Sequence, residues 1–145
     1  MQQFEYSDIS RMLTPILARH GGDASRLLQV LLEVQDACHT ISPEAIDRIA
    51  AHFEVPRVNV EGVAGFYSFL STQLVGEYRM LFSSNITDQM LGKDDLMQYL
   101  CNKLWVEPGK VSEDGLVSIA STSCTGMCDQ GPAALINGWP LTKLD

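Results

Sequence analysis

The chain has 145 residues, of which 46% are hydrophobic and 19% are charged, with a formal net charge of −8. This length suffices for one domain or two small packed units, and the composition is typical of a folded soluble protein. The negative charge argues against nucleic acid, whose phosphates attract basic surfaces, and against docking on anionic lipid. It is compatible with a protein partner that carries a basic patch.

The first residues show no targeting segment, because the N-terminus has neither the basic nor the apolar region of a signal peptide. No run approaches the ~18 apolar residues that span a bilayer. We therefore expect a cytoplasmic protein without membrane insertion. In that reducing compartment a close cysteine pair is more often redox-active or metal-binding than a structural disulfide. The isolated Cys38 and Cys101, flanked by apolar residues, are expected to be buried.

The first half of the chain predicts a helical bundle, with capping residues, helix breakers and apolar stripes at helical spacing. The predicted helices run from Ser7 or Asp8 to the Gly21-Gly22 pair, from Asp23 past Val34, from the Ser42-Pro43-Glu44 start signal past Phe53, and from Val58 to Leu70 after Pro56. His20 is expected to act as a favourable charge at a helix C-terminus. The aromatic residues of the last helix are expected to be core or interface residues: Phe66, Tyr67 and Phe69.

The pattern changes at Gly76, where short segments with strand propensity begin. The predicted elements are a strand at Tyr78–Phe82, a helix at Asp94–Leu104 with Asp94 and Asp95 in its first turn, and strands at Leu116–Ala120, Ala133–Asn137 and Trp139–Leu144, the last two joined by an Asn137-Gly138 hairpin turn. The sequence therefore predicts two domains, a helical bundle over 1–75 and an α+β domain over 76–145.

The most informative motif is Cys124-Thr-Gly-Met-Cys128, in a glycine-containing loop before a short apolar strand. Such a loop can direct both sulfurs at one point, as a metal or iron–sulfur site requires. A [2Fe-2S] cluster needs four ligands, however, and this loop offers two. A disulfide, free thiols and vestigial metal binding all stay open from the residues alone. No nucleotide-binding glycine motif is present, and the histidines do not fall at zinc-finger spacing from the cysteines.

Several segments in order along the whole chain resemble the 24-kDa-type subunit of respiratory complex I and its relatives in NAD-linked hydrogenases and formate dehydrogenases. The segments are Leu31-Leu32-Glu33-Val34-Gln35, Ile41-Ser42-Pro43-Glu44-Ala45, Val60-Glu61-Gly62-Val63-Ala64-Gly65-Phe66-Tyr67-Ser68-Phe69, the turn from Val106 to Gly115, and Ser123-Cys124-Thr125-Gly126-Met127-Cys128. The resemblance implies an α+β fold, with an N-terminal helical bundle followed by a thioredoxin-like [2Fe-2S] ferredoxin domain.

The resemblance also implies a ligand set for the cluster, made of one C-x4-C pair after the first ferredoxin strand and one later C-x3-C pair. Cys124 and Cys128 match the second pair. Alignment on Gly92 places the first pair at Ser83 and Asp88, so both of its cysteines are missing. Cys101 is not an obvious substitute, because it lies on the apolar stripe of its predicted helix.

The two replacements change the chemistry of the site, because cluster iron prefers thiolate and a serine hydroxyl must ionise to bind well. We therefore expect a degenerate site at Cys124 and Cys128, vestigial or partial, with no cofactor. The implied role is an accessory subunit or domain that packs on the flavin- and NAD(H)-binding subunit of a hydrogenase, formate dehydrogenase or complex I type enzyme and is not catalytic alone. The alternatives are a [2Fe-2S] carrier with mixed cysteine and oxygen ligands, and a free-standing thiol-redox or metal-binding protein.

Overall fold

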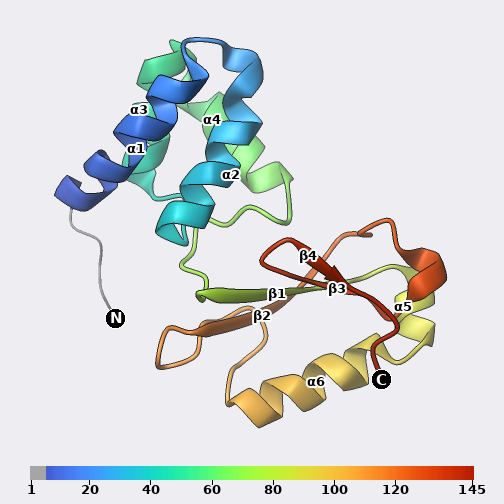
Figure 1. Cartoon of the computed structure of the whole chain (residues 1–145). Coiled ribbons are helices and arrows are strands. Elements are labelled where there is room, and N and C mark those ends of the chain that lie inside the picture. Colours follow the sequence, from blue (N-terminus) through green and yellow to red (C-terminus); the bar gives the residue numbers. More distant parts are fainter. Residues whose placement is uncertain (1–5) are drawn as a thin grey trace. The chain divides into compact units, whose positions relative to one another are not determined.

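The structure is a computed structural model that describes residues 6–145, with side chains from residue 8 onward. The chain divides into two compact units between residues 74 and 75, and each is described here by itself. Figure 1 shows helices in the first unit and a sheet with two further α-helices in the second.

The first unit is helical. Its elements are α1 (Tyr6–His20), a 3-10 turn η1 (Ala24–Arg26), α2 (Leu27–Cys38), α3 (Pro43–Phe53) and α4 (Arg57–Phe66). The Ser42 side chain accepts a hydrogen bond from the Ala45 amide, and Pro43 follows it at the first helical position, as the start signal predicts. Helices α2 and α3 end on residues with left-handed backbone conformation, His39 and Glu54.

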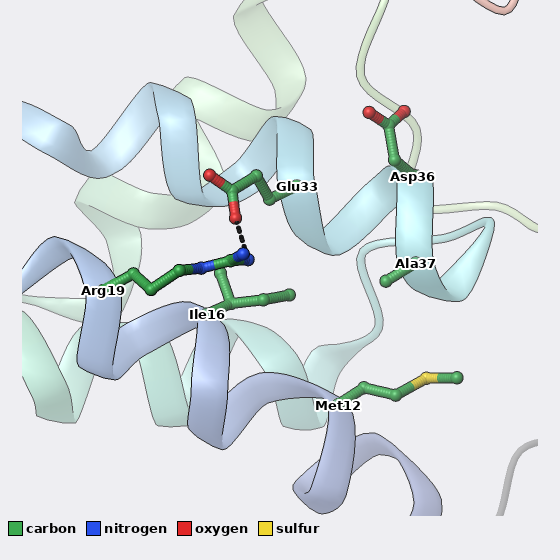
Figure 2. Close-up of a pocket in the computed structure, with 6 residues that line it drawn as sticks. All are labelled: Met12, Ile16, Arg19, Glu33, Asp36 and Ala37. Carbon is green, nitrogen blue, oxygen red and sulfur yellow. Dashed lines mark hydrogen bonds and ion pairs between the residues drawn. The ribbon is translucent and has the colours of Figure 1, made fainter.

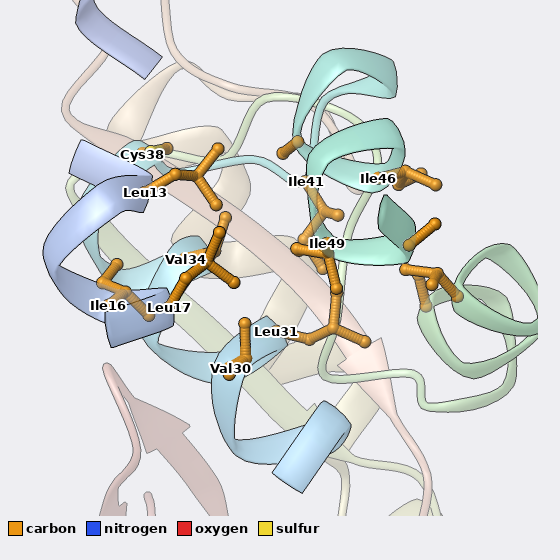
Figure 3. Close-up of a cluster of buried hydrophobic side chains, with 14 of the residues drawn as sticks. Leu13, Ile16, Leu17, Val30, Leu31, Val34, Cys38, Ile41, Ile46 and Ile49 are labelled. Carbon is orange, nitrogen blue, oxygen red and sulfur yellow. The ribbon is translucent and has the colours of Figure 1, made fainter. Parts of the chain in front are cut away.

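The apolar stripes of these helices form one core, which Figure 3 shows in part. Leu13 of α1, Leu31 of α2 and Ile49 of α3 are completely buried. Cys38 lies in the same core, as predicted, with its thiol directed at the Met12 sulfur at 3.5 Å. The helical unit is therefore held together by the residues that the predicted stripes identify.

Helix α4 ends at Phe66, so the prediction that it continues to Leu70 is wrong. The physical reason is a long-range contact from the buried side chain of Gln35 on α2. Its amide donates to the Phe69 carbonyl at 2.9 Å, and its oxygen accepts from the Ser71 amide at 2.6 Å. A buried amide needs such partners, and they hold residues 69–71 outside a helix.

The aromatic residues at this end of α4 separate into two groups. Tyr67 and Phe69 pack partly against the core. The Phe66 ring is 80% exposed, so it is not a core residue. The buried residues Val60 and Ala64 define the inner face of α4, and Phe66 follows Ala64 by two positions, about 200° further around the helix. The expectation that Phe66 is a core residue is wrong, and an interface role for it stays a prediction.

A groove runs between α1 and α2 and is shown in Figure 2. Arg19 and Glu33 face each other across it as an ion pair of 2.5 Å, and His20 reaches the same carboxylate at 2.7 Å. His20 lies in the last turn of α1, as predicted for a charge at a helix C-terminus. The hydrogen bond from His20, and then the charge of Arg19, lowers the pKa of Glu33. These contacts link α1 to α2.

The second unit is built on a four-stranded sheet. Its elements are β1 (Tyr78–Ser83), α5 (Ile86–Met90), α6 (Lys93–Leu104), β2 (Val117–Thr122), a 3-10 turn η2 (Cys128–Gln130), β3 (Ala134–Ile136) and β4 (Trp139–Leu141). The strand order is β2-β1-β3-β4, with β1 and β2 parallel and the other pairs antiparallel. The short helix α5 is an element that the sequence analysis does not predict.

The core of this unit is small. Phe82 of β1, Ile119 of β2 and Cys101 of α6 are buried, and Leu96, Met97 and Leu100 of α6 pack against them. Cys101 thus lies on the inner face of α6, as predicted. The acidic residues Asp94 and Asp95 occupy the first turn of α6, where negative charge favours a helix. The predicted α+β class is confirmed, and within residues 6–145 no helix has the length and apolar character needed to span a membrane.

Candidate functional site

The parallel pairing of β1 and β2 creates the candidate site. Ser83, the last residue of β1, is paired in register with Thr122, the last residue of β2. Parallel strands end at the same edge of a sheet, which is a frequent place for functional loops. The loop after β1 therefore lies beside the loop that begins at Ser123, one residue before Cys124.

The two thiols that the sequence singles out lie together. Cys124 Sγ and Cys128 Sγ are 3.3 Å apart, and both residues are exposed. The backbone amide of Gly126 donates to Cys124 Sγ at 3.4 Å. Among the side chains from residue 8 onward, no group of three or more His, Cys, Asp or Glu residues is placed to hold a metal ion.

Asn85 connects the two loops, and the sequence analysis does not identify it. Its Nδ2 donates to Cys128 Sγ at 3.3 Å, to Ser83 Oγ at 3.4 Å and to Cys124 Sγ at 3.6 Å. Its Oδ1 accepts from the Asp88 amide at 2.8 Å and so caps α5. An Asn three residues before an acidic residue is a helix-start pattern, and this signal could have predicted both α5 and its cap.

Ser83, at one of the two positions without cysteine, is completely buried at the end of β1. Its hydroxyl oxygen accepts a hydrogen bond from the Thr125 amide at 3.3 Å, in addition to the one from Asn85. The hydroxyl therefore ties the cysteine loop to β1 as a neutral hydrogen-bonding group.

Asp88, at the other such position, is also completely buried. Its Oδ1 accepts from the Ala133 amide at 3.1 Å, whereas no hydrogen-bond partner within residues 8–145 is found for its Oδ2. Gly131 lies close to this carboxylate, and a Cβ at position 131 would be 2.5 Å from Asp88 Oδ1. This close approach explains why a glycine occupies position 131. The carboxylate contacts the segment that leads into β3 and lies near enough to the thiols to oppose their ionisation.

The two thiols have unequal acidity. The hydrogen bond from the Gly126 amide, followed by those from the Cys128 thiol and the Asn85 amide, lowers the pKa of Cys124. The pKa of Cys128 is raised, mainly because its proton is shared with the Cys124 sulfur. Burial raises the pKa of Cys38 and of Cys101. Cys124 is therefore the thiol best prepared to react as a thiolate.

The structure brings the four sequence-predicted positions to one region, but their donors do not fit a cluster with four cysteine ligands. Cys124 and Cys128 supply thiolates. Ser83 and Asp88 supply hard oxygen donors, of which Ser83 Oγ and Asp88 Oδ1 already accept hydrogen bonds from backbone amides. The same end of the sheet is thus a polar, hydrogen-bonded site with one exposed thiol pair.

This fold agrees with the comparisons to known proteins. Residues 13–145 match the thioredoxin-like [2Fe-2S] ferredoxin family, and the chain belongs to that family. The resemblance stated from the sequence and the thioredoxin-like fold class are both confirmed.

Two relatives and one solved structure show which members of the family the chain is similar to. It is 31% identical over 140 residues to NADH-quinone oxidoreductase subunit 2 of Thermus thermophilus, covering 95% of this chain and 77% of that protein. It is 26% identical to the NAD-reducing hydrogenase HoxS subunit alpha of Cupriavidus necator, covering 91% of this chain and 22% of that protein. A crystal structure of NAD+-reducing [NiFe]-hydrogenase in the H2-reduced state matches with a TM-score of 0.71 and 30% identity, over 84% of this chain and 21% of that one. The chain therefore spans about a fifth of the hydrogenase relatives.

Proposed function

We propose that this chain is an accessory subunit or domain of a cytoplasmic NAD(H)-linked electron-transfer complex, of hydrogenase, formate dehydrogenase or complex I type. It packs on the flavin- and NAD(H)-binding subunit, carries a degenerate cluster site without a cofactor, and is not catalytic alone. The observation that carries the proposal is the family fold with oxygen donors at Ser83 and Asp88. Without a cluster, the remaining role of such a domain is to bind its partner subunit through its surface.

A candidate docking surface lies on α5 and the residue that follows it, next to Asn85, which contacts the thiol pair. Ile86, Met90 and Leu91 are 70%, 82% and 53% exposed, although all three are apolar. Apolar side chains at the centre of an interface contribute most of its binding energy. A stable contact of this kind buries on the order of 1,000 Å² or more, and the net charge of −8 favours a partner with a basic rim.

The proposal treats the two halves as domains, with a helical bundle over 1–75 and a ferredoxin-type domain over 76–145. The separate cores of the two compact units support this division. The exposed Phe66 ring at the end of α4 is a second candidate contact, on the helical domain.

The test is co-expression of the chain with its cognate NAD(H)-binding subunit, followed by pull-down and measurement of affinity. We expect a complex, and we expect Met90→Glu to weaken it by about tenfold or more, because a charge would be buried at the interface. Tyr99→Glu on α6, where the side chain is 57% exposed, is the control and should change affinity by less than about twofold.

Deleting the domain from the complex should lower NADH-linked turnover by destabilising the assembly, while flavin chemistry persists in the complexes that survive. If the two proteins do not associate, and deletion leaves assembly and turnover unchanged, the subunit proposal is wrong. A free-standing thiol-redox or metal-binding protein is then the better interpretation.

A second candidate function is electron transfer through a [2Fe-2S] cluster held by Cys124, Cys128 and oxygen donors. One observation favours it, namely the buried Asp88 Oδ2 without a hydrogen-bond partner in the described part of the chain. A carboxylate oxygen in that state is a possible ligand for iron.

Metal analysis separates the two candidates. We expect aerobically purified protein to contain well under one cluster per chain, because thiolate is the ligand that cluster iron prefers. The combined Ser83→Cys and Asp88→Cys variant, reconstituted with iron and sulfide without oxygen, is the positive control and should give a [2Fe-2S] absorption spectrum. A full complement of iron and acid-labile sulfide in the unmodified chain would contradict the cofactor-free proposal.

A further inference from the structure

We propose that Cys124 and Cys128 form a redox-active dithiol, which closes reversibly to an intramolecular disulfide by exchange with small disulfides of the glutathione type. This inference rests on the cofactor-free site proposed above. It assigns to the thiol pair a chemistry of its own, with a small-molecule disulfide as the oxidant and the corresponding thiol as the reductant.

The geometry permits this closure. The two sulfurs are already 3.3 Å apart, and a disulfide bond requires about 2.05 Å. Both residues are exposed, so an external disulfide can reach them. Between them lies Gly126 with a left-handed φ of +81°, a conformation that glycine adopts without strain and that turns the loop back on itself.

Hydrogen-bond donors from two loops hold both sulfurs in place. Cys124 Sγ accepts from the Gly126 amide at 3.4 Å and from Asn85 Nδ2 at 3.6 Å, and Cys128 Sγ accepts from the same Asn85 amide at 3.3 Å. Hydrogen bonds to sulfur stabilise the thiolate, which is the reactive form. Asn85 is thus a positioning residue that holds both sulfurs from the neighbouring loop.

The reaction has two balanced steps. The Cys124 thiolate attacks one sulfur of glutathione disulfide, so a new S–S bond forms to Cys124 and the first glutathione leaves as its thiolate. The Cys128 thiolate then attacks Cys124 Sγ, which forms the intramolecular disulfide and releases the second glutathione. The dithiol loses two electrons and two protons, and one glutathione disulfide becomes two glutathione molecules.

The other two cysteines are internal controls. Cys38 and Cys101 are both 2% exposed, each in the core of its own unit. Buried thiols in apolar surroundings react slowly. Selective oxidation at 124 and 128 is therefore a specific expectation for this fold.

The test equilibrates the full chain with glutathione buffers of graded redox ratio, quenches with acid, alkylates under denaturing conditions and maps the modified peptides by mass spectrometry. We expect a Cys124–Cys128 disulfide that forms and reverses with the buffer ratio, while Cys38 and Cys101 stay alkylatable. Cys128→Ser should instead accumulate glutathione on Cys124, because the second step lacks its nucleophile. Asn85→Ser keeps a capping oxygen for α5 but removes the amide donor, and it should slow the reaction several-fold.

Two results would overturn the inference. One is the absence of the disulfide at every buffer ratio in metal-free protein. The other is a reaction at Cys38 or Cys101 that is as fast as at Cys124. Iron or zinc content measured on the same sample separates the proposals. Stoichiometric metal that protects the thiols until a chelator is added overturns the cofactor-free site as well, whereas a metal-free but unreactive pair overturns the dithiol inference alone.

Discussion

Phe82→Ala should lower the free energy of unfolding of the ferredoxin-type unit by about 3–5 kcal/mol, the range for truncating a fully buried aromatic side chain. Phe82 lies on β1, an inner strand of the sheet, and is 1% exposed. Among the described residues, it belongs to a cluster with four other buried members: Cys101, Val106, Ile119 and Ala134. Because this core is small, few neighbours can move in to fill the space that the ring leaves.

The measurement is denaturant unfolding followed by tryptophan fluorescence. Both tryptophans of the chain, Trp105 and Trp139, lie in this unit, so the signal reports on it. Tyr78→Ala is the matched control on the same strand, since the Tyr78 ring is 50% exposed, and it should cost about 1 kcal/mol or less. Equal losses for the two variants would show that Phe82 does not anchor the core.

The sequence predicts the fold well where local signals and the family resemblance agree. The Ser42-Pro43 start signal, the strand that ends near Phe82 and the Asn137-Gly138 turn between β3 and β4 all appear in the structure. In each case the deciding information lies within a few neighbouring residues, such as a cap, an apolar alternation or a turn dipeptide.

Features that depend on distant partners are not visible in the sequence. The end of α4 depends on Gln35, which lies 34 residues before its partner Phe69. Nothing in an apolar helix pattern says that one glutamine will turn inward and bind a loop. Helix α5 has five residues, too few for a period of 3.6 to be recognised, and it is specified mainly by its Asn85 cap.

The candidate site likewise has features that the sequence predicts and features that it does not. The spacing of Cys124 and Cys128 indicates a site, and the resemblance adds Ser83 and Asp88. The hydrogen bonds that define its present chemistry come from backbone amides, at Gly126, Thr125 and Ala133, and from Asn85. Backbone donors carry no residue signature, so these hydrogen bonds could not be predicted from the sequence.

Gly76→Ala should destabilise the same unit by roughly 1–3 kcal/mol, the usual cost of forcing extra volume into a packed region. Gly76 is buried just before β1, and a Cβ there would lie 2.5 Å from the Val117 carbonyl carbon and 2.7 Å from the Ser118 nitrogen. These are backbone atoms of β2, so they cannot rotate away as a flexible side chain could. The Gly76 amide also donates to Ser118 Oγ at 3.0 Å, a bond that the added methyl group would strain.

Gly62→Ala is the matched control, because it adds the same methyl group in the middle of α4 with nothing within 4 Å of the new Cβ. Alanine favours a helix over glycine by about 0.5–1 kcal/mol, so this variant should be more stable than the unmodified chain. Unfolding followed by far-UV circular dichroism for Gly62→Ala, and by tryptophan fluorescence for Gly76→Ala, measures the two effects. The decisive result is that the free energy of unfolding falls in Gly76→Ala and rises in Gly62→Ala.

The start of β1 sets the register that brings Ser83 beside the cysteine loop. Gly76→Ala should therefore also loosen the contact between Ser83 Oγ and the Thr125 amide, which would be measured as faster hydrogen exchange at Thr125. A Gly76→Ala variant with unchanged stability and unchanged exchange would show that the close approach of Gly76 to β2 does not hold this register.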